Sequence, residues 1–74
     1  MGSIKLDERL KELRTEKGFT QEEMADILNI AYRSYQNYEI GVSIPNAKVL
    51  YNMAMYFNVS LDYLIGCSNV RERR

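Results

Sequence analysis

The sequence predicts an all-α fold of five short helices around one modest core. Apolar residues recur at intervals of about three and four residues through most of the chain, which is the spacing of a helix with one buried face. Glycine, asparagine, proline and capping side chains divide this pattern into five segments. A chain of 74 residues has room for one core and not for two ordinary domains. We therefore expect one domain at residues 1–66 and a charged C-terminal tail at residues 67–74.

The first helix is expected over residues 6–17. Its apolar face consists of three regularly spaced leucines, Leu6, Leu10 and Leu13. Charged side chains occupy most positions between them, as on a helix whose outer face is solvated. Gly18 follows and can take the left-handed conformation that commonly ends a helix.

A capping box predicts that the second helix begins at Gln21. The Thr20 side chain can accept a hydrogen bond from the backbone N–H of Glu23, and the Glu23 carboxylate can reach back to the backbone of Thr20. Asn29 tolerates the left-handed conformation that a tight turn requires, so we expect the helix to end there. Its buried face is expected to consist of Met24, Ile27 and Leu28.

The third helix is expected over residues 32–39 and is closed by Gly41. Its cap position is Ala31, whose side chain accepts no hydrogen bond, so its start is marked more weakly than the others. A fourth helix follows Pro45 and Asn46, because proline disfavours helix in the residue before it and asparagine caps well. The fifth, short helix lies between a capping serine and a closing glycine, Ser60 and Gly66.

The composition argues against several classes of function. The sequence has no histidine, which removes the most common general base and the Ser-His and Cys-His pairings, so we expect no enzyme. The single cysteine, Cys67, cannot form an intramolecular disulfide, and no cluster of zinc ligands exists. We expect no cofactor, and no small-molecule ligand is evident. No apolar run approaches the ~18 residues of a membrane span, and the amino terminus lacks a signal core, so we expect a cytoplasmic location without membrane contact.

The net charge of zero is unusual for a protein that binds nucleic acid, since such proteins are mostly basic. The positions of the basic residues matter more than their sum. They concentrate on the first helix, the third helix and the tail, as Arg9, Lys11, Arg14, Lys17, Arg33, Arg71, Arg73 and Arg74. Residues 20–41 nevertheless remain net negative. Because phosphate attraction supplies most non-specific affinity for DNA, a protein with this charge distribution would bind non-specific DNA only weakly.

The second helix, a short turn and the third helix occupy the segment TQEEMADILNIAYRSYQNYEIG, in which Ala25 can lie where the two helices cross. Together with LKELRTEKGFTQEEMA before it and NVSLDYLIG near the end, this segment resembles the Cro/CI-type (XRE family) phage repressors. The resemblance covers residues 6–66. It implies a lambda-repressor-like domain with a helix-turn-helix at the second and third helices. It also implies a transcriptional repressor that binds an inverted-repeat operator in double-stranded DNA as a homodimer.

The third helix is expected to have one buried side and one side that faces DNA. At about 100° per residue, Tyr35 and Tyr38 point one way, toward the core, and polar side chains group on the opposite side. Such side chains can read base edges in the major groove, although a merely solvated face has the same composition. By the resemblance, the base-reading positions are Tyr32, Arg33 and Asn37, with Gln36 as a further candidate between them, and Gln21 matches a phosphate contact.

The resemblance also implies an ion pair, because Arg14 and Glu39 match positions that pair in phage repressors. A homodimer is expected because one short helix contacts few base pairs and two-fold operators match two-fold proteins. The candidate dimer interface lies on the last helix and consists of Leu61, Tyr63 and Ile65.

The loop after the third helix departs from the family. Members of the family often contact phosphate there with polar or basic residues, whereas this chain has Ile40-Gly41-Val42-Ser43-Ile44. This departure favours a second interpretation, a helical protein–protein interaction module such as an antitoxin-like or adaptor protein. The basic run from Arg71 to Arg74 is likewise open to two interpretations, a DNA-binding arm or a solvated tail.

Overall fold

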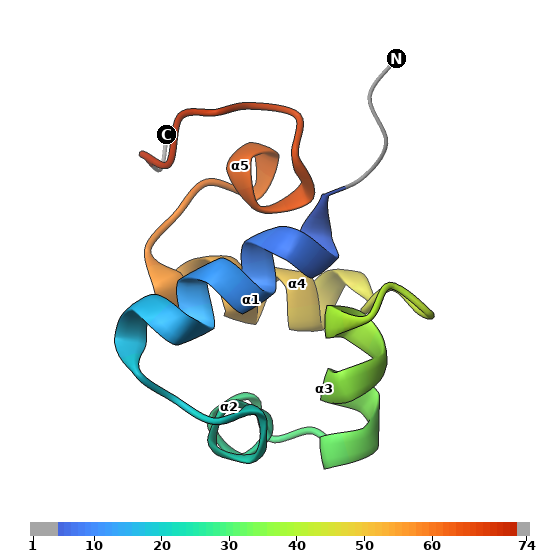
Figure 1. Cartoon of the computed structure of the whole chain (residues 1–74). Helices are drawn as coiled ribbons and strands as arrows, with labels where there is room; N and C mark the ends of the chain where they lie inside the picture. Colours follow the sequence, from blue (N-terminus) through green and yellow to red (C-terminus); the bar gives the residue numbers. More distant parts are fainter. Residues whose placement is uncertain (1–4, 73–74) are drawn as a thin grey trace.

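The computed structural model describes residues 5–72, and within them it contains the five expected helices and no strand. They are α1 (Leu6–Lys17), α2 (Gln21–Leu28), α3 (Tyr32–Glu39), α4 (Ala47–Phe57) and α5 (Leu61–Ile65) (Figure 1). The all-α fold class is confirmed. The first four residues of the expected domain, and Arg73 and Arg74 of the expected tail, lie outside the described residues.

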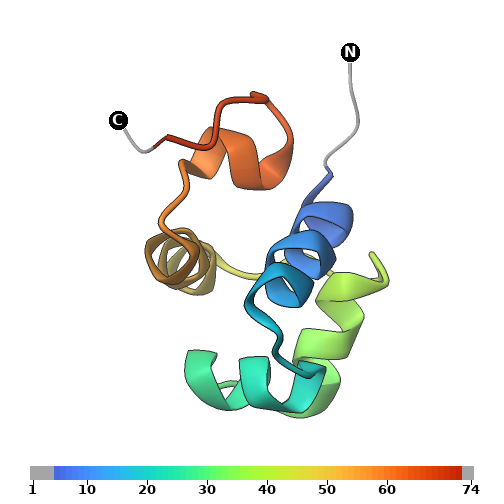
Figure 2. The ribbon, with the colours of Figure 1, turned by 60° about the vertical axis from the view of Figure 1, so that its left-hand side comes forward.

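The helices stack so that the helix-turn-helix and the C-terminal segment lie on opposite sides of the molecule. Figure 1 shows α2 and α3 below α1 and α4, with α5 and the segment after it above them, and the turned view in Figure 2 agrees. Contacts between helices follow this order: α1 packs on both α3 and α5, α2 packs on α3 and α4, and α4 packs on α5. The expected recognition helix α3 is therefore held from behind by α1 and from the side by α2.

Side-chain caps fix where α2, α4 and α5 begin. The capping box is present, with Glu23 N donating to Thr20 Oγ1 at 3.1 Å and Thr20 N donating to Glu23 Oε1 at 2.8 Å. The Asn46 side chain accepts from the backbone N–H of Val49, and Ser60 caps α5 in the same way. At Ala31, where α3 begins, no side chain caps the helix. The start of α3 therefore depends on its packing more than on its cap.

One hydrophobic core joins all five helices. Its buried members are Leu6, Leu10, Leu13, Met24, Ala25, Leu28, Tyr35, Met53, Ala54, Phe57, Val59, Tyr63 and Leu64. Two expectations about the core were wrong in detail. Ile27 is 40% exposed, because Met24, Ala25 and Leu28 define the inner side of α2 and Ile27 lies about 100° from its centre. Tyr38 is only half-buried and packs against the edge of the core.

Candidate nucleic-acid interface

The four candidate base-reading residues all lie on α3. Tyr32 and Arg33 are exposed, while Gln36 and Asn37 are half-buried. None of these side chains makes a hydrogen bond or an ion pair with another residue in the described range 5–72. Their polar groups are therefore open to an external partner.

The inner side of the same helix is committed to the fold. Tyr35 is fully buried, and Glu39 is the one buried charged residue of the described chain. The Tyr35 hydroxyl donates to Glu39 Oε2 at 2.6 Å, which links successive turns of α3 on its inner side. The helix thus has the buried side and the exposed polar side that the sequence predicts.

The ion pair expected between Arg14 and Glu39 is present and joins α1 to α3. Arg14 Nε lies 2.6 Å from Glu39 Oε2, and Arg14 Nη2 donates to Glu39 Oε1 at 3.2 Å. The two side chains are only 13% and 3% exposed. Arg14 also donates through Nη1 to the carbonyl of Phe19 at 2.7 Å, so the pair holds the start of the helix-turn-helix as well.

The electrostatics of this cluster keep Glu39 ionised. Burial by itself disfavours the carboxylate, but hydrogen bonds from Arg14, Tyr35 and Gln21 outweigh that effect and lower the pKa of Glu39. The hydrogen bond to Glu39 raises the pKa of Arg14. Burial, together with the hydrogen bond to Glu39, raises the pKa of Tyr35, which therefore stays a neutral donor. The cluster is a charged pair, Arg14 and Glu39, to which two neutral groups, Tyr35 and Gln21, donate hydrogen bonds.

Gln21, the candidate phosphate contact, belongs to the same cluster. It is the first residue of α2 and half-buried, and its Nε2 donates to Glu39 Oε1 at 3.0 Å. The structure thus brings Gln21 together with Arg14 and Glu39, while none of the four base-reading candidates belongs to this cluster. The bond between Gln21 and Glu39 joins residues 18 positions apart, and no local pattern in the sequence indicated it.

Two arginines that the sequence counted toward DNA attraction are engaged at the opposite end of the molecule. Arg9 lies over the ring of Tyr63, 3.9 Å from its centroid, and donates to the Tyr63 carbonyl at 2.9 Å. Arg71 lies 5.2 Å from the same ring centroid and donates to Glu16 Oε2 at 2.6 Å. The hydrogen bond from Arg71 lowers the pKa of Glu16. The described part of the tail is therefore attached to α1 and α5 through Arg71.

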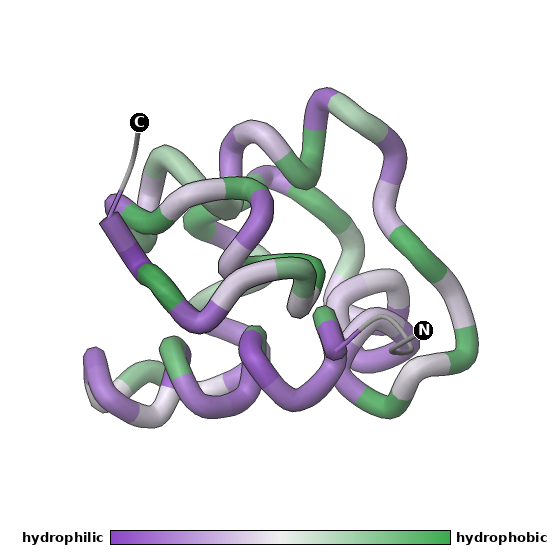
Figure 3. Tube along the Cα trace, turned by 90° about the horizontal axis from the view of Figure 1, so that it is seen from above, coloured by the Kyte–Doolittle hydropathy of each residue, from purple (hydrophilic) through white to green (hydrophobic). Residues whose placement is uncertain are grey.

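The loop of residues 40–44 leaves three apolar side chains in solvent. Ile40, Val42 and Ile44 are 66%, 70% and 62% exposed. The backbone N–H groups of Val42 and Ser43 both donate to the carbonyl of Asn37, which folds the loop back against the end of α3. Along the right-hand edge of Figure 3 hydrophobic positions alternate with nearly neutral ones through this loop. An apolar surface thus lies directly beside the candidate DNA-reading face.

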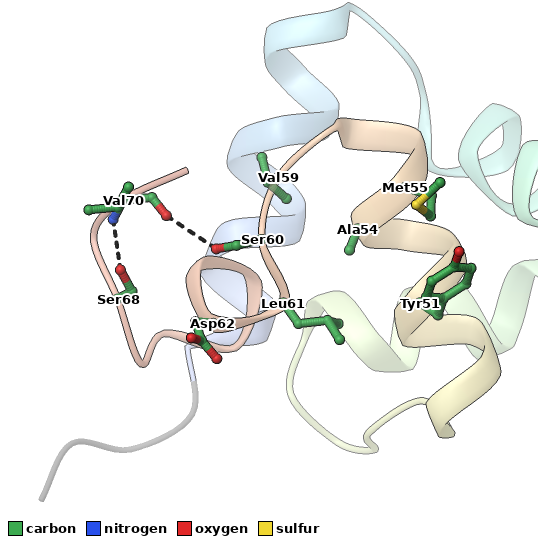
Figure 4. A pocket seen from close by; sticks show the side chains of 9 residues that line it. All are labelled: Tyr51, Ala54, Met55, Val59, Ser60, Leu61, Asp62, Ser68 and Val70. Carbon is green, nitrogen blue, oxygen red and sulfur yellow. Dashed lines mark hydrogen bonds between the residues drawn. The ribbon is translucent and has the colours of Figure 1, made fainter. Parts of the chain in front are cut away.

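Of the three candidate dimer residues, Tyr63 is not available to a partner. It is 5% exposed, and its hydroxyl donates to Glu12 Oε1 at 2.9 Å, because α5 turns this side chain onto α1. Leu61 is 44% exposed and Ile65 is half-buried. Leu61 lies at the edge of an open groove of about 380 Å³ between α4, α5 and the tail (Figure 4). The residues that line this groove are Tyr51, Ala54, Met55, Val59, Ser60, Leu61, Asp62, Ser68 and Val70.

Within residues 5–72, none of the helices combines the length and the apolar character that crossing a bilayer requires. The same part of the chain contains no group of three or more His, Cys, Asp or Glu side chains placed to hold a metal ion. Cys67 is exposed and unpaired within it.

Comparisons with known proteins agree with this geometry. A family model described as helix-turn-helix matches residues 10–64. The SPbeta prophage-derived uncharacterized HTH-type transcriptional regulator YonR of Bacillus subtilis is 45% identical over 58 residues, covering 78% of this chain and 54% of that protein. The HTH-type transcriptional regulator ImmR of the same organism is 39% identical over 70 residues, covering 95% of this chain and 55% of that protein.

A crystal structure of a transcriptional regulator from Listeria innocua has a TM-score of 0.83 and 31% sequence identity to this chain. The match covers 88% of this chain and 61% of that one. The chain spans about half the length of the curated relatives it matches.

Proposed function

The chain belongs to the helix-turn-helix (XRE) family of transcriptional regulators, and from this premise we propose that it is a repressor that binds an inverted-repeat operator as a homodimer. The observation that carries the proposal is the open polar surface of α3. Its four polar side chains have no partner among residues 5–72, while the inner side of the helix is packed and ion-paired against α1. A rigid helix with an open polar side suits reading of base edges in the major groove.

Each candidate residue has a distinct chemical role. The Arg33 guanidinium can donate two parallel hydrogen bonds to guanine O6 and N7, and the amides of Gln36 and Asn37 can pair with adenine N6 and N7. Tyr32 offers a ring for a thymine methyl and a hydroxyl for a phosphate. Gln21, at the first turn of α2, is the proposed phosphate contact that fixes the register of α3 without reading sequence.

The distribution of charge supports weak binding to non-specific DNA. Arg14 is paired with Glu39, and Arg71 with Glu16, so neither offers its full charge to phosphate. Phosphate attraction is the main source of non-specific affinity, so discrimination must come from base contacts repeated over two half-sites. Repression needs no further surface, because a dimer that covers promoter DNA excludes other proteins from it.

A binding selection on random duplexes tests this function. We expect the purified protein to enrich an inverted repeat whose half-sites are about one helical turn apart. Arg33→Ala should keep the wild-type melting curve but lose preference at one base pair of each half-site, at a cost of about 1–3 kcal/mol. Lys11→Ala, an equal change of charge at an exposed position on α1, is the matched control and should leave the preference intact. Unchanged base preference in Arg33→Ala would show that α3 is not the reader.

The exposed loop favours one second candidate function, an antitoxin-like or adaptor module that binds another protein. Ile40, Val42 and Ile44 form an apolar surface of the kind that commonly marks protein contacts. Absence of any enriched duplex at low salt would favour this candidate over operator binding. In that case Ile40→Ser with Val42→Ser should abolish partner binding while Arg33→Ala leaves it unchanged.

A further inference from the structure

The side-chain amide of Gln21 donates a hydrogen bond to the carboxylate of Glu39. We propose that this hydrogen bond orients Gln21 for contact with a phosphate of bound DNA. Glu39 is then a positioning residue, which touches no DNA and acts through Gln21. The inference rests on the proposed function, because the phosphate contact exists only if the helix-turn-helix binds DNA as described above.

The acceptor capacity of Glu39 is fully used. Oε2 accepts from Arg14 Nε and from the Tyr35 hydroxyl, both at 2.6 Å. Oε1 accepts from Arg14 Nη2 at 3.2 Å and from Gln21 Nε2 at 3.0 Å. An ionised carboxylate offers about four acceptor sites and no donor. With its side chain 3% exposed and held by α1 and α3, this carboxylate is a fixed acceptor.

A fixed acceptor determines which way the Gln21 amide faces. If the amide were reversed, its oxygen would lie against Glu39 Oε1, and two acceptors would meet without a hydrogen between them. The nitrogen must therefore face Glu39. A side-chain amide carries two N–H donors, and its planarity directs the second one away from the first. Because Gln21 is half-buried at the first turn of α2, that second donor remains for an external acceptor.

Orientation of this kind acts on affinity and not on sequence preference. A glutamine without a fixed partner loses rotamer freedom when it binds phosphate, and here that loss has already occurred in the free protein. Contacts to phosphate carry no sequence information. Disrupting the contact should therefore weaken binding to every duplex by the same factor.

A double-mutant cycle on DNA affinity separates positioning from general support of the fold. Gln21→Ala, Glu39→Gln and the double variant are compared by fluorescence anisotropy on the selected operator and on a random duplex, at a temperature where circular dichroism shows each variant folded. We expect Gln21→Ala to weaken binding to both duplexes by about tenfold per protomer, the range of one lost charge-assisted hydrogen bond. Glu39→Gln should weaken binding to both duplexes by a smaller factor, because it removes only the orientation of Gln21. The double variant should bind no more weakly than Gln21→Ala. If the fold-losses of the two single variants multiply in the double variant, the two residues act independently and the proposal is overturned.

Tyr35→Phe is the matched control. It removes a donor from the other oxygen of Glu39 and leaves the bond to Gln21 in place. We expect it to lower the midpoint of urea unfolding and leave the Kd unchanged; a loss of affinity equal to that of Glu39→Gln would mean that Glu39 acts only by supporting the fold. If Glu39→Gln does not fold, Arg14→Met with Glu39→Met removes the carboxylate without leaving Arg14 unpaired.

A measurement on the free protein distinguishes failure of this inference from failure of the proposed function. In NMR, the two side-chain amide hydrogens of Gln21 should exchange with solvent at different rates, the one donated to Glu39 being slower. Equal rates would overturn the orientation. A wild-type protein that binds the operator no better than random duplex would instead overturn the proposed function, whatever the exchange rates show.

Discussion

Glu39 receives four hydrogen bonds while almost completely buried, so its ionisation is coupled to folding. Its pKa is lower in the folded protein than its ordinary value because the hydrogen bonds from Arg14, Tyr35 and Gln21 outweigh the effect of burial. A lowered carboxyl pKa contributes stability that is present above the unfolded pKa of about 4.3 and is lost as the pH falls through the folded pKa.

We therefore expect the free energy of unfolding to fall as the pH is lowered below about 4.3, in urea titrations at a series of pH values. Arg14→Met with Glu39→Met replaces the pair by apolar side chains and removes this titration. Its stability should depend less steeply on pH over the same range, with the remaining difference due to the other carboxylates. Parallel curves for the two proteins would show that Glu39 contributes nothing to acid sensitivity.

At the scale of single residues, the sequence predicted roles that depend on near neighbours and missed roles that depend on distant ones. The inner position of Tyr35 follows from the angle between residues on one helix. The ion pair between Arg14 and Glu39 was predicted from the family resemblance and from no other feature of the sequence. The contacts of Tyr63 with Arg9 and Glu12 join residues 54 and 51 positions apart, so no local pattern carries them. For that reason the sequence placed Tyr63 on a dimer surface, and the structure places it in the core.

Whole helices were easier to predict than their contacts, because most starts and stops depend on a few adjacent residues. The second helix begins at its capping box, and Asn29 and Asn58 end helices in the left-handed conformation, with φ of 57° and 56°. Ile27 shows the limit of such reasoning. Periodicity allows several neighbouring positions on the apolar side of α2, and only the packing against α3 and α4 decides which of them are covered.

The glycines that end α1 and α5 provide a prediction at the scale of elements. Both have positive φ, 76° at Gly18 and 92° at Gly66, but their surroundings differ. A Cβ on Gly18 would meet nothing within 4 Å, whereas one on Gly66 would lie 2.9 Å from Lys5 Cβ and 3.0 Å from its backbone nitrogen. That nitrogen donates to the carbonyl of Ile65, so it cannot move away freely.

Gly18→Ala should therefore cost about 1–2 kcal/mol, the strain of a left-handed residue alone. Gly66→Ala should cost about 1–3 kcal/mol more than Gly18→Ala, because the start of α1 must also shift. Urea unfolding of both variants measures the difference. Equal losses would mean that the contact between the end of α5 and Lys5 is unimportant for stability.

At the scale of the molecule, the fold separates Arg9 and Arg71, which make their contacts within the chain, from the open polar face. Arg9 and Arg71 hold the C-terminal segment on α1 and α5, on the side opposite α2 and α3 (Figure 1). The backbone N–H of Ser60 also donates to the carbonyl of Arg71 at 2.8 Å. The sequence located these basic residues correctly on its first helix and tail, but it could not show that their charge is used within the chain.

Dimerisation is the remaining prediction at this scale. Leu61 is 44% exposed at the edge of the groove between α4 and α5, so Leu61→Ser should change monomer stability by only about 0.5 kcal/mol and weaken self-association. Ile27→Ser, at a position 40% exposed on α2, is the matched control and should leave association unchanged. Sedimentation equilibrium with and without operator measures the association of both variants. In a dimer on DNA, the two recognition helices should lie about 34 Å apart. A wild-type protein that sediments as a monomer both free and on the operator would contradict the proposed homodimer, because one α3 would then have to supply the whole of sequence discrimination.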